Sequence, residues 1–156
     1  MVAIIQRRSV IHPRVVVMSR MCQQVFIDGP LPSANDIIRK HWRVYSKFKK
    51  DWGILTKVAV RRHGLQPMQA QEPIRRVMIA FEWIEATDRL DRDRDPDNIA
   101  FSAKFILDAL VQEKILRDDS RREIHSLHHI FAMDSVTPGV MVTLTELDEP
   151  QQNQEG

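Results

Sequence analysis

Apolar positions along this chain follow two periods, one typical of strands and one typical of helices. Every second residue is apolar in the segment 76–85, which predicts a strand with one buried face. Its apolar residues are Val77, Ile79, Phe81 and Trp83. Shorter apolar segments bounded by turn residues predict three further strands, at residues 22–28, 124–133 and 140–147.

From Ile38 onward, large residues recur at intervals of three and four, which predicts a long amphipathic helix. The apolar stripe runs through Trp42 and Trp52, and we expect the helix to end near Gly64, with an interruption at Gly53. Lysines and arginines occupy most of the remaining positions. This helix is therefore expected to have a basic outer surface, and the candidate DNA-binding residues are Lys40, Arg43, Lys47, Lys49 and Lys50.

A second helix is expected at residues 98–112, where apolar residues again follow the helical period. Together these elements predict an α+β fold in one domain, with a small mixed sheet packed against two main helices. We expect the domain to span residues 21–148. We expect residues 1–20 to be a disordered basic N-terminal extension and residues 149–156 to be a polar tail.

Net charge is +2, but the charges are segregated along the chain. Residues 1–70 carry 13 Lys and Arg against three acids, whereas residues 71–156 carry 10 against 18. A basic surface beside an acidic pocket suits a protein that handles phosphodiesters, since the acidic pocket alone would repel them. The single Cys22 excludes an internal disulfide and is typical of a reducing cytoplasm. No apolar run approaches the ~18 residues of a membrane span, so we expect no membrane association.

Four aspartates bracket the second helix. Asp95 and Asp97 stand before it, and Asp118 and Asp119 stand after it. Carboxylates are the ligands that Mg²⁺ prefers, and Pro96 restricts the backbone between the first two. If the helix folds back beside the preceding strand, Asp119 can converge with Asp95 and Asp97 on one or two Mg²⁺ ions. Such a site is suited to metal-assisted phosphodiester hydrolysis.

On a continuous helix, Asp97, Lys104 and Asp108 would lie within roughly 60° of one another, along a line distinct from the buried face. Asp108 and Asp118 are therefore candidates for supporting positions around the metal ligands.

The ordered residues 95–99, Lys104, 108–110 and 118–120 resemble the central motif of the RusA family of Holliday junction resolvases, found in phages, prophages and bacteria. The resemblance covers about residues 22–147 and is most specific between 76 and 120. It implies a cytoplasmic, Mg²⁺-dependent homodimeric endonuclease that nicks two strands of a four-way DNA junction in recombination and repair.

Carried over by position, the resemblance implies that Asp95, Asp97 and Asp119 bind the metal and that Lys104 is the essential lysine. In compact members of the family the lysine follows the second aspartate by about one turn. Here Lys104 lies nearly two turns after Asp97, as if three residues had been inserted. Two alternatives stay open: a non-catalytic nucleic-acid-binding module in which the acids are structural, and a nuclease for other branched DNA.

Overall fold

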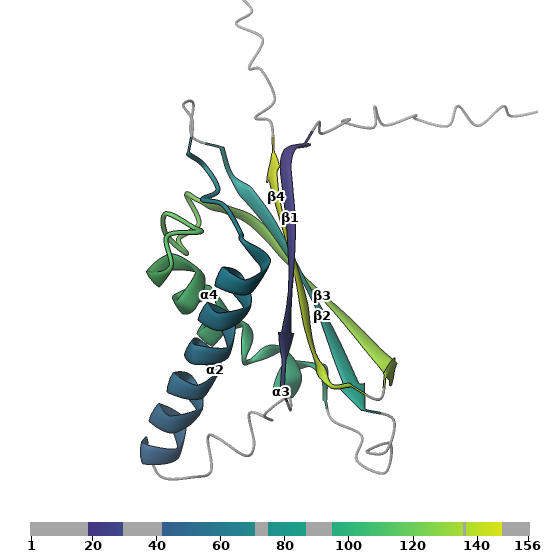
Figure 1. Ribbon diagram of the computed structural model, residues 1–156. Coiled ribbons are helices and arrows are strands. Elements are labelled where there is room, and N and C mark those ends of the chain that lie inside the picture. The colour runs from purple at the N-terminus through teal and green to yellow at the C-terminus, as the bar shows by residue number, and fades with distance from the viewer. Residues whose placement is uncertain (1–18, 30–41, 71–74, 87–94, 136, 148–156) are drawn as a thin grey trace, which may run out of the picture.

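A computed structural model describes residues 19–29, 42–70, 75–86, 95–135 and 137–147 of the chain. These residues form four strands and three helices (Figure 1). In chain order they are β1 (Ser19–Asp28), α2 (Trp42–His63), β2 (Val77–Ala86), α3 (Pro96–Ala100), α4 (Ala103–Gln112), β3 (Ile124–Ser135) and β4 (Gly139–Leu147).

The strands form one mixed sheet in the order β1-β4-β2-β3. β4 pairs antiparallel with both β1 and β2, whereas β3 pairs parallel with β2. Parallel neighbours require a crossover, because the chain must return to the end at which the first strand began. α3 and α4 belong to this crossover. The α+β class, with a small mixed sheet and two main helices, α2 and α4, is thereby confirmed.

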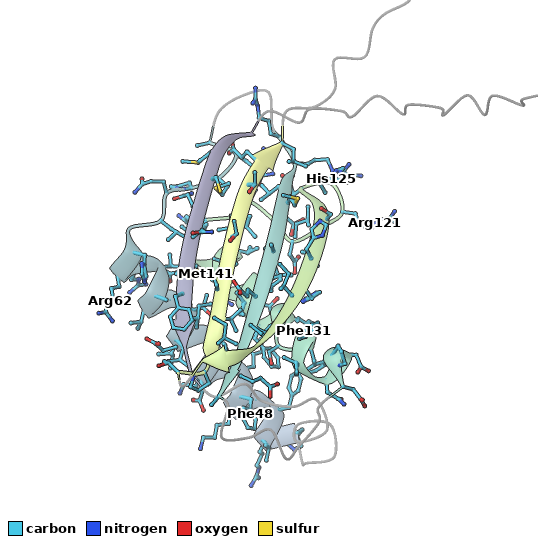
Figure 2. The ribbon with its side chains drawn as sticks, turned by 90° about the vertical axis from the view of Figure 1, so that its right-hand side faces the viewer. Phe48, Arg62, Arg121, His125, Phe131 and Met141 are labelled. Carbon is cyan, nitrogen blue, oxygen red and sulfur yellow. The ribbon has the colours of Figure 1, made fainter. Side chains whose placement is uncertain are left out.

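The described helices all lie on one face of the sheet (Figure 1). This face of β2 presents fully buried side chains at every second position, including Phe81 and Trp83. Trp52 from α2 and Phe105 and Leu110 from α4 belong to the same buried cluster. Burying this apolar surface is the main driving force for folding, at about 25 cal/mol per Å². The opposite face of the sheet is turned toward the viewer in Figure 2, and none of the described helices covers it.

α2 runs without interruption through Gly53, contrary to the expected break, and ends one residue before Gly64. Gly64 adopts a positive φ of 63°, which glycine tolerates because it lacks a Cβ. Its N–H donates to the Arg61 carbonyl at 3.2 Å, and the Leu65 N–H donates to the Val60 carbonyl at 3.1 Å. This pair of hydrogen bonds is the Schellman arrangement that satisfies the last carbonyls of a helix.

The second expected helix is divided into α3 and α4 by a turn at Phe101 and Ser102. The turn closes with hydrogen bonds of the i→i−3 kind, from Ser102 N–H to the Ile99 carbonyl at 3.4 Å and from Phe105 N–H to the Ser102 carbonyl at 3.0 Å. Phe101 packs edge-on against Phe105, with ring centroids 5.7 Å apart, and Ser102 is fully buried. Side-chain packing in the core therefore accompanies a break that the apolar period alone did not predict.

Gly139 and Gly53 form a matched pair for testing how closely β1 and β4 pack at Gly139. A Cβ at Gly139 would overlap the Phe26 ring and lie 2.7 Å from the Ile27 carbonyl oxygen, whereas a Cβ at Gly53 would meet nothing within 4 Å. We expect Gly139→Ala to lower the free energy of unfolding by about 1–3 kcal/mol through overpacking. Gly53→Ala should raise it by about 0.5–1 kcal/mol through better helix propensity. Urea denaturation measures both, and an unchanged Gly139→Ala midpoint would contradict the tight β1–β4 contact.

Candidate functional site

Asp95 and Asp97, here named the α3 pair, stand at the start of α3. Asp95 is the residue that precedes the helix, Pro96 occupies its first turn, and both carboxylates are exposed. The Asn98 side-chain amide donates a long hydrogen bond of 3.5 Å to Asp95. Within the described residues, Asp97 makes no hydrogen bond or ion pair through its carboxylate. Two acidic side chains are therefore presented to solvent from one short element.

Contacts with the hydrophobic core hold α3 in place. Ile99 is 6% exposed and belongs to the main buried cluster, and Ser102 directly after the helix is completely buried. The Ser102 hydroxyl has no hydrogen-bond partner among the described residues. Because an apolar anchor holds the helix on its inner side, the α3 pair is carried on a fixed support rather than on a free loop.

Lys104 and Asp108 lie one turn apart on α4, whereas Asp97 lies on α3. The turn at Phe101 and Ser102 separates the two helices, so the three residues are not carried by the one continuous helix that was expected. Lys104 is exposed. Asp108 instead forms an ion pair with Lys49 of α2, with Nζ and Oδ2 2.9 Å apart. This pair joins the two main helices.

The Lys49–Asp108 ion pair joins a candidate DNA-binding residue to a candidate supporting residue of the metal site. The hydrogen bond from Lys49 to the Asp108 carboxylate, followed by their charge attraction, raises the pKa of the lysine. Asp108 is therefore engaged by a cation of its own chain, and Lys49, expected to contact DNA, is paired with an acid. An exposed ion pair of this kind stabilises the fold by less than about 1 kcal/mol.

Asp118 and Asp119, here named the β3-turn pair, lie in the turn that leads into β3. Both side chains are exposed, and the Asp119 N–H donates to the Asp118 carboxylate at 2.9 Å. The turn is closed by the Ile124 N–H, which donates to the Ser120 carbonyl at 2.9 Å. Asp119 has no ion-pair partner among the described residues.

The two acidic pairs lie at opposite ends of the sheet. Val77, the first residue of β2, pairs with Ile124, the first residue of β3. The β3-turn pair precedes this end, whereas α3 lies at the end where β1 and β2 finish (Figure 1). The ten residues of β2 span about 33 Å at ~3.3 Å per residue. Within one chain, therefore, Asp119 does not join Asp95 and Asp97, and the described residues contain no group of three or more side chains able to hold a metal.

The basic surface expected on α2 is partly exposed and partly used in contacts with α4. Arg43, Lys47 and Lys50 are exposed, and the Arg43 guanidinium lies 5.7 Å from the centre of the Trp42 ring. Lys40 falls outside the described residues. At the other end of α2, Arg61 donates two hydrogen bonds of 2.9 Å to Glu113, which lower the pKa of that carboxyl.

His129 of β3 is an exposed residue that contacts two buried aromatic side chains of β2. Its ring stacks on Phe81 with centroids 5.3 Å apart, and its Nδ1 accepts a hydrogen bond of 3.0 Å from the Trp83 indole N–H. Desolvation, reinforced by the neighbouring His128, lowers the pKa of the His129 imidazole. The apolar pattern did not predict this contact, because it does not show that β3 pairs with β2 or that Phe81 lies opposite His129.

Comparison with models of known protein families found no matching family, and comparison with curated protein sequences found no match. Within the described part of the chain, no helix is both long and apolar enough to cross a membrane.

The His129 contact predicts a pH dependence of stability. The pKa of this imidazole is lower in the folded protein than in the unfolded chain, where it is about 6.5. Below about pH 6.5 the unfolded chain takes up a proton that the folded protein resists, so stability falls as the pH decreases. Urea unfolding at pH 7.5 and 5.5 should show a larger loss for the wild type than for His129→Gln. His125→Gln, at an exposed position of the same strand, should retain the wild-type loss, and equal losses in all three proteins would contradict the assignment.

Proposed function

We propose that this chain is a Mg²⁺-dependent endonuclease that nicks branched DNA, with the four-way junction as its substrate. The proposal rests on which acidic side chains have basic partners and which do not. Asp108 and Glu113 each hold a basic side chain of α2, whereas the acids of the α3 pair and the β3-turn pair have no basic partner among the described residues. Asp95, Asp97 and Asp119 are the three positions to which the RusA resemblance assigns metal binding, whereas Asp108, a candidate supporting residue, is paired with Lys49.

The donor chemistry fits a hard divalent cation, but one chain supplies too few ligands at one place. Mg²⁺ is commonly held by one or two carboxylates together with water and substrate phosphate oxygens. Asp95 and Asp97 could provide two such carboxylates, and a bound ion would lower the pKa of water and neutralise the leaving oxygen. Asp119 lies at the other end of the sheet, so it completes the set only if it comes from a second chain.

A homodimer with two-fold symmetry resolves this separation. In such a dimer, Asp119 of each chain can approach the α3 pair of the other, which yields two identical sites. Two identical sites suit the paired nicking of a four-way junction, whose arms are themselves related by near two-fold symmetry. Lys104 is exposed at the second position of α4, two residues after Ser102, and is proposed to stabilise charge that develops on the phosphate.

The exposed cations of α2 are proposed to bind the DNA backbone. Lys47 and Lys50 are exposed and are proposed to contact phosphates, as is the exposed guanidinium of Arg43, and such contacts supply affinity without reading sequence. Lys49 contributes less to such contacts, since Asp108 already occupies its ammonium group.

A non-catalytic nucleic-acid-binding module is the second candidate. The observation that favours it is the absence of a three-ligand metal group among the residues described in a single chain. In that case the basic helix would carry the function and the acids would be solvated surface charges.

Cleavage of a synthetic four-way junction separates the two candidates. We expect purified protein to nick the junction with Mg²⁺ and not with EDTA. Asp97→Asn should lower the cleavage rate by on the order of 100-fold or more, because a lost metal ligand removes several kcal/mol of stabilisation. Junction binding should be retained, and Asp51→Asn, an exposed aspartate of α2 outside the motif, should cut normally. A binding module would show no Mg²⁺-dependent cleavage in any of these proteins.

Mixed dimers test whether the site is shared between chains. Asp97→Asn and Asp119→Asn should each be inactive alone. After unfolding and refolding together, half of the dimers carry one copy of each variant. If the site is shared, each mixed dimer retains one intact site, and about a quarter of all sites recover. If one chain supplied all the ligands, every site would keep one substitution, and the mixture would stay inactive.

A further inference from the structure

β3 forms one edge of the sheet. Its inner edge pairs with β2, and no described strand pairs with its outer edge. The strand runs for twelve residues, from Ile124 to Ser135, or about 40 Å at ~3.4 Å per residue. Figure 2 shows it along one side of the sheet, with His125 and Phe131 at two points of its length. A long row of backbone N–H and C=O groups is therefore available for pairing.

Exposed apolar side chains flank this edge on both faces of the sheet. Leu127 is 43% exposed, Ile130 53% and Phe131 39%. Leu127 is in register with Ile79 and Phe131 with Trp83, so both lie on the face that carries the helices. Ile130 is in register with Glu82 and lies on the open face. A strand added at this edge would shield exposed apolar side chains on both faces of the sheet from water.

β3 lacks several of the usual features that protect an edge strand from pairing, although its register with β2 shifts near each end and Asp134 lies close to its C-terminal end. Residues 124–132 contain no Pro, Lys, Arg, Asp or Glu. The other edge of the sheet, β1, differs, because it exposes polar or small side chains at Cys22, Gln24 and Asp28 and has α2 packed beside it. The two edges of the sheet are therefore not equivalent, and β3 is the one suited to pairing.

We propose that the outer edge of β3 pairs antiparallel with β3 of a second copy of this chain. Two identical strands related by a two-fold axis perpendicular to the sheet are necessarily antiparallel. A register that places His129 opposite its own copy also places Leu127 opposite Phe131 of the partner subunit. Directly opposite side chains share a face in antiparallel pairs, so Leu127 and Phe131 cover one another, whereas Ile130 lies opposite His128 of the partner subunit. Residues 124–132 contain no Lys, Arg, Asp or Glu, so this register places no two of these side chains opposite one another within that segment, and the two copies of His129 face each other.

This pairing deepens the proposed function by naming the dimer surface, and it rests on that proposal only where the acids are concerned. Because the paired strands run in opposite directions, the start of β3 in one chain meets the end of β3 in the other. The β3-turn pair of each chain then lies at the same end of the joined sheet as the α3 pair of the other chain. Edge pairing is therefore compatible with the shared acidic site.

Lysine substitutions at the edge test the interface. We expect the wild type to sediment as a dimer at micromolar concentration. Leu127→Lys and Ile130→Lys should each weaken the dimer at least about 10-fold, because each places two like charges beside a pairing strand. Val58→Lys on α2 is the matched control, since Val58 is 58% exposed but lies away from the edge, and it should remain dimeric. Circular dichroism establishes that each variant is folded. A monomeric wild type, or dimers unaffected by both edge lysines, would overturn the proposal.

Disulfide formation tests the register in a Cys22→Ser background. Opposed residues of an antiparallel pair have Cα atoms about 4.5–5.5 Å apart, within the range of a disulfide. His129→Cys should therefore form a covalent dimer under mild oxidation. His125→Cys should not, because its two copies would be about 27 Å apart at ~3.4 Å per residue. Equal cross-linking at both positions would overturn the proposed pairing. If the protein dimerises but does not cut DNA, the nuclease function is contradicted and the proposed pairing is not. If a monomer cuts DNA, the proposed pairing is contradicted and the nuclease function is not.

Discussion

The parallel pairing of β2 with β3 is the constraint on which the rest of the structure depends. A parallel pair forces the chain to travel back along the sheet between the two strands, and α3 and α4 lie on that return path. Residues that follow β2 and residues that precede β3 are thereby held at opposite ends of the sheet. The acids are consequently divided into two exposed pairs by topology, and no local rearrangement of side chains can unite them within one chain.

One-sided packing explains why these acids remain available. The helices bury the inner face of β2 through Phe81 and Trp83, and ion pairs between α2 and α4 contribute comparatively little to stability. Hydrophobic burial fixes the supporting elements, so the charged residues at their ends need not neutralise one another to hold the fold together. The same arrangement leaves one sheet face and one long strand edge without a described covering element.

Sequence periodicity predicted the number and kind of strands and the fold class, because burial on one face imposes period two on strands such as β2. It missed the break before Ala103, since a short turn that keeps Phe101 and Phe105 packed leaves the apolar spacing almost unchanged. Sequence periodicity also did not predict which residues contact one another. The stacking of His129 on Phe81 and the pairing of Lys49 with Asp108 depend on which elements become neighbours. The separation of Asp119 from Asp95 likewise follows from strand direction, which period two does not encode.

The turn at Phe101 and Ser102 has a consequence for how chains of this kind can vary in length. In an unbroken helix, three extra residues would rotate everything downstream by about 300° and turn the buried side of α4 away from the sheet. A joint between α3 and α4 uncouples the two segments, so additional residues can be absorbed there while Ile106 and Leu110 keep their places in the core. The spacing between Asp97 and Lys104 can therefore change at this turn without moving the buried residues of α4 out of the core.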